Sequence, residues 1–137
     1  MVDMKVDVIL PCLDEADALP TVIGRLPDGY RAIVVDNGST DGSADSARAL
    51  GALVVTESRR GFGSACAAGV EAATAEYVAF CDADASMDPA ELPPLVRRVA
   101  EGRTDRALGR RVPTTPGAWA PHARFANRVL AVLMHRA

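Results

Sequence analysis

Two aspartates one residue apart, Asp82 and Asp84, follow directly on an apolar run in the stretch AFCDADASMDP, residues 79–89. Aspartate is rare in strands and costly to bury, so an apparently buried strand that ends in Asp-Ala-Asp needs a reason. Such carboxylates can hold a divalent metal ion, or they can form an ordinary solvated turn. Asp88 precedes Pro89, a pair that favours a capped helix start over a third carboxylate of the same site.

Other residues with chemical potential also stand where apolar runs end. The segment Pro11-Cys12-Leu13-Asp14-Glu15 follows the first run, Asp36-Asn37-Gly38-Ser39-Thr40-Asp41 the second, and Arg59-Arg60-Gly61-Phe62-Gly63 comes shortly after the third. Glycine lets a backbone approach a ligand closely, and arginine suits a diphosphate. Both arginines are equally compatible with a solvated position. For the last aspartate of the second segment, a turn or helix cap is the preferred interpretation.

The elements that must position these residues alternate between strands and helices. Strands are expected at residues 5–11, 32–35, 53–56 and 77–81, with 107–109 as a candidate fifth. Helical patterns begin near residue 14 and at 43–50, 64–75 and 89–101, followed by a proline-rich loop at 112–121 and a helical pattern at 122–136. This order predicts an α/β fold, a three-layer αβα sandwich around a mainly parallel sheet.

The carboxyl ends of parallel strands lie along one edge of a sheet, where ligands bind in such folds. All of the polar segments described above fall at that edge. Their carboxylates would repel one another unless a cation joined them. A divalent cation that bridges phosphate groups satisfies this requirement, and hard oxygen ligands suit Mg²⁺ or Mn²⁺.

Composition and charge exclude some functions and leave others open. Aromatic residues are only 4% of the chain, so nucleic-acid binding by base stacking is not expected. Residues 1–96 hold six Lys or Arg and sixteen Asp or Glu, whereas residues 97–137 hold nine Arg and two acids. The basic end fits either an anionic partner or a solvated surface. No apolar run approaches the roughly 20 residues that span a bilayer, and no signal peptide is evident, so a cytoplasmic location is expected.

The chain resembles the family 2 glycosyltransferases of the GT-A fold, the nucleotide-diphospho-sugar transferases. The resemblance is carried, in family order, by VILPCLDEADALPTVI, IVVDNGSTDGSADSARAL and RRGFGSACAAGVEAATAEYVAFCDADASMDP. Within that family the chain is most similar to the dolichol-phosphate-mannose and polyprenyl-phosphate-sugar synthases, in which a DADxxxxP pattern recurs. A dinucleotide-binding fold is disfavoured, because Cys66 stands where its glycine fingerprint needs a third glycine.

The resemblance implies a role for each matching residue. Asp36 would bind the nucleobase, and Asp84 and Asp82 would hold Mg²⁺ or Mn²⁺, with Asp84 the more direct ligand. The family usually has Asn before Glu15, where this chain has Asp14. The residues expected to bind the nucleotide or donor are Pro11, Leu13, Glu15, Asp36, Gly61, Gly63 and Asp82.

The implied activity is a metal-dependent transfer of a hexose, with inversion, from GDP-mannose or UDP-glucose to polyprenyl phosphate at the inner face of the membrane. Residues 1–110 would form the nucleotide-sugar-binding core. Residues 111–137 would form a basic loop and the start of a helix on the acceptor side, incomplete because relatives continue further. The family's catalytic base lies beyond the Asp-Ala-Asp motif, so none is assigned. The alternative is a non-catalytic nucleotide-binding fragment or a truncated member. The candidate ligands of the acceptor phosphate are Arg110, Arg111, Arg124 and Arg128.

Overall fold

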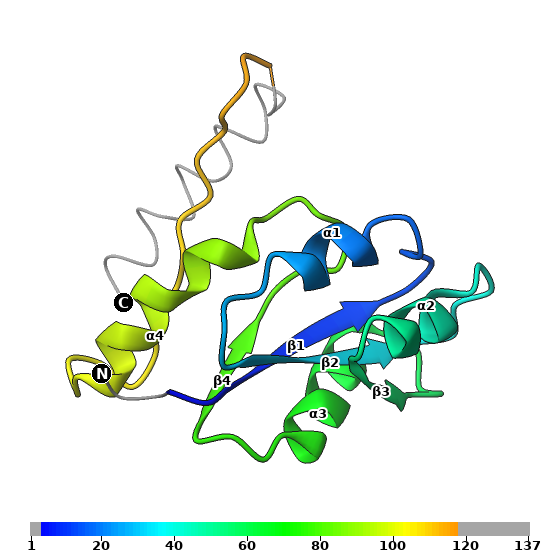
Figure 1. Ribbon diagram of the computed structural model, residues 1–137, viewed down its shortest axis with the longest axis horizontal. Helices are drawn as coiled ribbons and strands as arrows, with labels where there is room; N and C mark the ends of the chain where they lie inside the picture. The colour runs from blue at the N-terminus through cyan, green and yellow to red at the C-terminus, as the bar shows by residue number, and fades with distance from the viewer. Residues whose placement is uncertain (1–3, 118–137) are drawn as a thin grey trace. The chain divides into compact units, whose positions relative to one another are not determined.

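A computed structural model of the chain describes residues 4–117 (Figure 1). Contacts divide the chain into two units, Met1–Ala107 and Leu108–Ala137. The first unit carries every helix and strand of the described residues. The described part of the second unit, residues 108–117, is exposed chain with neither helix nor strand. No helix within residues 4–117 is long and apolar enough to cross a bilayer.

The sheet has four strands, all parallel, in the order β3-β2-β1-β4. The two central strands, β1 and β2, are almost continuously buried, whereas side chains of the edge strands are partly exposed. Continuous burial is typical of parallel strands with helices on both faces. Each of the four main strand predictions is confirmed to within two residues. The strands are β1 (Val6–Cys12), β2 (Tyr30–Asp36), β3 (Leu53–Thr56) and β4 (Tyr77–Phe80).

The helices are α1 (Leu19–Gly24), α2 (Ser43–Ala49), α3 (Phe62–Ala72) and α4 (Leu92–Ala100), with a short 3₁₀ helix, η1 (Pro89–Glu91), before α4. Asp88 caps η1 as predicted, because its Oδ1 accepts the Ala90 N–H at 3.0 Å. The same carboxylate binds Arg25, with 2.8 Å between Nε and Oδ1. The predicted helix start near residue 14 is wrong. Residues 14–18 form a loop and turn, because their backbone is held by other contacts that are described below.

The strand order determines which face each helix covers. From β1 to β2 to β3 the sheet grows in one direction, and the next strand, β4, returns to the opposite side of β1. Because parallel crossovers are right-handed, this reversal places α3 on the other face of the sheet from α1 and α2 (Figure 1). The core has two parts accordingly. One contains residues of α1, α2 and α4, and the other packs Ala65 of α3 against Ile9 and Ile33.

The candidate strand at residues 107–109 is wrong, since these residues form no strand. An extended segment becomes a strand only by pairing with another, and residues 107–109 pair with none of the described strands. The helical pattern at residues 122–136 lies outside the described residues.

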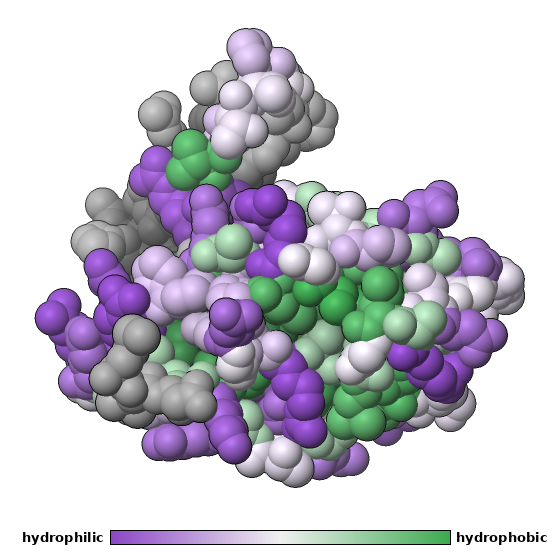
Figure 2. Space-filling view, viewed as in Figure 1, coloured by the Kyte–Doolittle hydropathy of each residue, from purple (hydrophilic) through white to green (hydrophobic). Residues whose placement is uncertain are grey.

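Within the sheet, β4 pairs on one side only, with β1. Val78 and Phe80 of β4 keep 39% and 49% of their surface exposed. Elsewhere too, hydrophobic side chains reach the surface, among them a broad group on the face seen in Figure 2.

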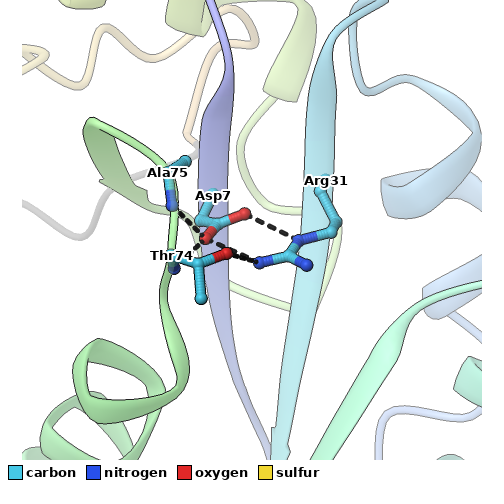
Figure 3. A network of polar contacts seen from close by, with 4 residues as sticks. All are labelled: Asp7, Arg31, Thr74 and Ala75. Carbon is cyan, nitrogen blue, oxygen red and sulfur yellow. Dashed lines mark hydrogen bonds and ion pairs between the residues drawn. The ribbon is translucent and has the colours of Figure 1, made fainter.

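Asp7 is a buried carboxylate in the middle of the sheet, and the sequence pattern gave no reason for it. Its side chain is 2% exposed and forms a two-point ion pair with Arg31 of β2, with both N–O distances 2.8 Å. Its Oδ2 also accepts the backbone N–H groups of Thr74 and Ala75, between α3 and β4 (Figure 3). The hydrogen bond from Arg31, opposed in part by burial, lowers the pKa of Asp7 to about 2. One carboxylate thus joins β1, β2 and the entry to β4.

We expect Asp7→Asn to lower the free energy of unfolding at pH 7 by about 2 kcal/mol, the value of the pKa depression. The folded pKa lies below the ordinary value of 3.8, so the contribution of Asp7 is present above pH 4. It is lost as the pH falls toward 2. Urea unfolding of the wild type and of Asp7→Asn should therefore give free energies that differ at pH 7 and become equal as the pH falls from 4 toward 2. Asp45→Asn, which removes an exposed pair with Arg48, is the control and should change little.

A second prediction concerns the packing of α3 on β1 at Gly69. A Cβ at this position would overlap the side chain of Ile9, which is fully buried. Alanine favours helices by up to about 1 kcal/mol over glycine, but overpacking costs roughly 1–3 kcal/mol. Gly69→Ala should therefore destabilise the protein in thermal unfolding. Gly63→Ala, in open space on the same helix, should leave the melting temperature unchanged or raise it. Equal effects of the two substitutions would contradict this packing argument.

Candidate functional site

A cavity of about 340 Å³ opens at the carboxyl ends of the strands. It lies where the strand order reverses, between the ends of β1 and β4 and beside the first turn of α3. Crevices at such reversals are the usual ligand sites of open parallel sheets. The cavity is lined by Pro11, Cys12, Leu13, Glu15, Asn37, Arg60, Gly61, Phe62, Ala65, Asp82, Ala83 and Asp84.

Six of the predicted site residues line this one cavity, although they come from three segments of the chain. They are Pro11, Leu13, Glu15, Gly61, Asp82 and Asp84. Two others do not line it. Asp36 is buried at the end of β2, where its Oδ1 accepts the Ser39 N–H at 3.1 Å. Gly63 lies within the first turn of α3. Their roles in nucleotide binding stay predictions.

The loop that carries Glu15 is held by side chains of the loop after β2. Three successive backbone N–H groups, those of residues 14, 15 and 16, donate to Ser39 Oγ, Ser43 Oγ and Asp41 Oδ2, each at 2.9 Å. These bonds satisfy donors that a helix starting at residue 14 would leave unpaired at its first turn. The left-handed φ of 56° at Asp14 excludes a right-handed helix that begins there, and the three bonds fix the backbone of Glu15 at the pocket.

The side chain of Asp14 in turn accepts one hydrogen bond from the loop after β2. Its Oδ1 accepts the Thr40 N–H at 2.7 Å, and its backbone has a φ of 56°, in the left-handed region. Asparagine and aspartate enter that region more readily than other non-glycine residues. Both can also accept this hydrogen bond through a side-chain oxygen. Asp14 therefore has a structural role that the family's usual Asn could also fill.

A turn or helix cap was the role predicted for Asp41, but the N-cap residue of α2 is Gly42, and Asp41 binds the first residue of the helix from the turn before it. Its Oδ1 accepts the backbone N–H and the hydroxyl of Ser43 at the start of α2, while its other oxygen holds Ala16. These hydrogen bonds, the Ser43 hydroxyl first, lower the pKa of Asp41 below its ordinary value. Asp41 thus joins the start of α2 to the loop that leads into α1.

Glu15 stands in an electrostatic environment that disfavours its charge. Burial raises the pKa of Glu15, and the neighbouring carboxylates of Asp84, Asp41 and Asp14 raise it further. Glu15 and Asp84 line the same cavity. A cation in this cavity would relieve the repulsion between the two carboxylates.

The donor set of the cavity is chemically suited to Mg²⁺ or Mn²⁺. Within residues 4–117 no three His, Cys, Asp or Glu side chains form a ready metal site. Asp82 and Asp84, however, both line the cavity, whose volume of about 340 Å³ can hold phosphate groups. Mg²⁺ is commonly held by one or two carboxylates together with substrate phosphates and water, so this pair fits it. The Ser86 N–H, 2.9 Å from Asp84 Oδ1, orients one of these carboxylates.

Asn37 lines the cavity too, and its part in the site was missed from the sequence. Its carboxamide makes three hydrogen bonds to the loop that joins β3 to α3, with Glu57, Arg59 and Gly61. The sequence indicated only a turn at Asn37-Gly38. No local pattern identifies its partners, because they lie 20 to 24 residues away.

The role predicted for four arginines, as ligands of the acceptor phosphate, stays a prediction. Arg110 and Arg111 are exposed residues of the second unit. Arg124 and Arg128 lie outside the described residues. Of the two arginines after β3, Arg60 lines the cavity, and Arg59 does not.

The model of one protein family, "Glycosyl transferase family 2", matches residues 7–128. The chain belongs to this family. An uncharacterized glycosyltransferase of Mycobacterium tuberculosis is 49% identical to it over 126 residues, which are 92% of this chain and 57% of the relative. The undecaprenyl-phosphate 4-deoxy-4-formamido-L-arabinose transferase of Serratia proteamaculans is 31% identical over 97% of this chain and 44% of its own length. The chain thus spans 57% of the length of the Mycobacterium tuberculosis relative and 44% of the length of the Serratia proteamaculans relative.

A solved structure supports the same relationship. Glucosyl-3-phosphoglycerate synthase from Mycobacterium tuberculosis, in complex with Mn²⁺, UDP-glucose and phosphoglyceric acid, superposes with a TM-score of 0.63 and 32% identity. The match covers 72% of this family 2 chain and 40% of the synthase. Another structure of that synthase holds Mg²⁺ and UDP. The predicted GT-A fold is confirmed by this match. The resemblance to dolichol-phosphate-mannose synthases in particular has no such support.

We expect Glu15→Gln to stabilise the ligand-free protein at pH 7, because it removes a charge that its surroundings disfavour. The pKa of Glu15 is raised in the folded state. The free energy of unfolding of the wild type therefore falls as the pH rises through the range in which Glu15 loses its proton. In acid, where Glu15 is protonated, the wild type and Glu15→Gln should be equally stable. Thermal unfolding of both proteins at pH 3 and pH 7 measures this. Glu71→Gln, on the exposed side of α3, is the matched control. A lower melting temperature for Glu15→Gln at pH 7 would refute the electrostatic account.

Proposed function

We propose that this chain is the nucleotide-sugar-binding part of a metal-dependent glycosyltransferase that transfers a hexose with inversion. The observation that carries the proposal is the convergence of Asp82, Asp84, Glu15, Arg60 and Gly61 on one cavity at the carboxyl edge of the sheet. A nucleoside diphosphate is commonly bound by an arginine and by a bridging metal ion. Arg60 can supply the first contact, and the carboxylates can hold the metal ion for the second. Membership of glycosyl transferase family 2 supports the same chemistry.

For the donor, UDP-glucose and GDP-mannose are the candidates, and UDP-glucose is the first to test. The synthase that shares the fold binds UDP-glucose with Mn²⁺. In this proposal Gly61 lies against the nucleotide and Arg60 against its phosphates. Asp36 and Gly63 do not line the cavity, and their contacts with the base and ribose stay a prediction. Arginine binds phosphate oxygens with two parallel hydrogen bonds, which would fix the orientation of the diphosphate.

Asp84, with Asp82 beside it, would hold a Mg²⁺ or Mn²⁺ ion. The ion would supply positive charge where negative charge develops on the departing nucleoside diphosphate. The carboxylate of Glu15 lies close enough to that of Asp84 for their negative charges to repel each other. Because its own charge is disfavoured there, Glu15 reinforces the preference of the cavity for a cation.

For the acceptor we propose polyprenyl phosphate, which would be met at the inner face of the membrane. A relative from Serratia proteamaculans is named as an undecaprenyl-phosphate transferase. A phosphate oxygen is already anionic and can attack the sugar carbon without a general base, so the chain would need none. Arg110, Arg111, Arg124 and Arg128 are the proposed ligands of this phosphate. Phosphoglyceric acid, bound by the solved synthase, is the other acceptor class to test.

A second candidate function is nucleotide binding without transfer. It is favoured by the share of the relatives that this chain covers, 57% in the Mycobacterium tuberculosis protein. Two measurements on the 137-residue chain separate these functions. One is Mn²⁺-dependent UDP or GDP binding, and the other is transfer of labelled glucose or mannose to polyprenyl phosphate. Binding without transfer or donor hydrolysis would favour the second function, and no metal-dependent binding would refute both.

We expect Asp84→Ala to abolish the Mn²⁺-dependent part of UDP binding, because it removes the proposed direct metal ligand. Isothermal titration with UDP, with and without Mn²⁺, measures this dependence. The matched control is Asp88→Asn, four residues along the same segment. Asp88 caps η1 and binds Arg25 instead of lining the cavity, and Asn can still cap the helix. Asp88→Asn should bind UDP as the wild type does. Unchanged metal dependence in Asp84→Ala would refute the ligand role.

A further inference from the structure

Asn37 occupies a central place among the loops at the carboxyl edge of the sheet. It follows β2, which lies between β1 and β3. Its backbone N–H donates to the Cys12 carbonyl at the end of β1, at 2.9 Å. The residue is 8% exposed, and it forms part of the cavity wall. Asn37 is therefore fixed by the sheet itself before its side chain makes any contact.

The side chain of Asn37 is directed entirely at the loop between β3 and α3. Its Nδ2 donates to the carbonyls of Glu57 and Arg59, at 2.8 and 2.9 Å. Its Oδ1 accepts the N–H of Gly61, at 2.9 Å. The loop has only five residues, 57 to 61, and alternate residues of it are bound to this one carboxamide. Both side-chain donors and one acceptor lone pair are thereby used within the protein.

The bonds of Asn37 enclose the part of the loop that faces the cavity. Arg60 lies between the bound residues Arg59 and Gly61, and both Arg60 and Gly61 line the cavity. Gly61 has a φ of 126°, which side chains rarely allow, and it precedes the first residue of α3. The Nη2 atom of Arg60 lies 4.0 Å from where a Cβ would stand at Gly38, the residue after Asn37. The guanidinium thus lies against the turn that Asn37 begins.

No hydrogen bond or ion pair from the Arg60 side chain to another residue within 4–117 holds the guanidinium in place. Its position at the cavity therefore depends on the backbone around it. A free loop of five residues would sample many conformations, and ordering it on binding would cost free energy. A loop that is already held by Asn37 avoids most of this cost.

We infer that Asn37 is a positioning residue, which holds the Arg60-Gly61 segment in the conformation that receives the diphosphate of the donor. Asn37 acts through Arg60 in this role, not through a bond of its own to the ligand. The inference rests on the proposed function, because it takes a nucleoside diphosphate as the ligand. It assigns to Asn37 a part in donor affinity that its place in an Asn-Gly turn did not suggest.

The test is a double-mutant cycle on UDP binding in the presence of Mn²⁺. Arg60→Ala should weaken UDP binding by about ten- to a hundredfold, the value of hydrogen bonds to a charged group. Asn37→Ala should weaken it by a similar factor. The double variant should bind UDP at most about twofold more weakly than whichever single variant binds it less tightly. The reason is that both substitutions remove the same interaction, the one between Arg60 and the diphosphate. Arg59→Ala removes the same charge one residue away from the cavity and should bind UDP as the wild type does.

Additive losses in this cycle, or wild-type affinity in Asn37→Ala, would overturn the inference. A merely structural role for Asn37 gives additive losses, because it would weaken the fold without regard to Arg60. Thermal unfolding shows whether each variant is folded. If Asn37→Ala is not, the cycle is run with Asn37→Asp, which keeps the shape of the side chain and an acceptor for Gly61 but loses both donors.

A measurement without ligand separates this inference from the proposed function. Trypsin cleaves after Arg59 and Arg60, and a held loop resists cleavage. We expect several-fold faster cleavage at these bonds in folded Asn37→Ala than in the wild type, and equal rates would overturn the inference. If the wild type binds neither UDP nor GDP with Mn²⁺, the proposed function fails. The cleavage rates still decide whether Asn37 holds the loop.

Discussion

The right-handedness of parallel crossovers is the constraint on which this molecule depends. Two crossovers build β1, β2 and β3 in one direction, and the third reverses it to place β4 beside β1. The reversal places α3 on the opposite face of the sheet. The loops that leave the carboxyl ends of the strands therefore turn toward opposite faces at this point. The cavity opens where they diverge, and its position follows from the strand order alone. Side-chain chemistry then decides what the cavity can bind.

The loops around that cavity are held by side chains that bind backbone, which accounts for the polar character of the segment Asp36–Asp41. Ser39, Asp41 and Ser43 take up three successive N–H groups of the loop after β1, and Asn37 takes up the loop after β3. Backbone groups in irregular segments need such partners wherever they are not fully hydrated. The loop after β2 is thus the framework of the site. The neighbouring loops, once fixed, present Glu15, Arg60 and Gly61 to the cavity.

The strands could be predicted from the sequence because burial on both faces leaves near-continuous apolar runs, and the carboxyl ends of these strands include many of the residues that line the cavity. The errors have a common physical cause. The start of α1 and the role of Asn37 are set by hydrogen bonds between residues 20 to 28 positions apart, and such bonds leave no periodic signal. The carboxylate of Asp7 is a similar case, since its partners Thr74 and Ala75 are 67 and 68 residues away. The strand predicted at residues 107–109 fails because Ala-Leu-Gly has little preference for a strand and pairs with none of the described strands.

Two carboxylates, Asp7 in β1 and Glu15 just after it, show how opposite surroundings give the same group opposite electrostatics. Asp7 finds within the chain all that its charge requires, a guanidinium and two N–H groups, and its pKa falls. Glu15 is also partly desolvated, but the charges around it are carboxylates, and its pKa rises. Carboxylates whose pKa values are shifted by burial and by like-charged neighbours are found more often at functional sites than elsewhere. A cation bound in the cavity would reduce the repulsion between Glu15 and the carboxylates around it. The unfavourable electrostatics of the cavity are therefore an argument for its function, independent of any resemblance in sequence.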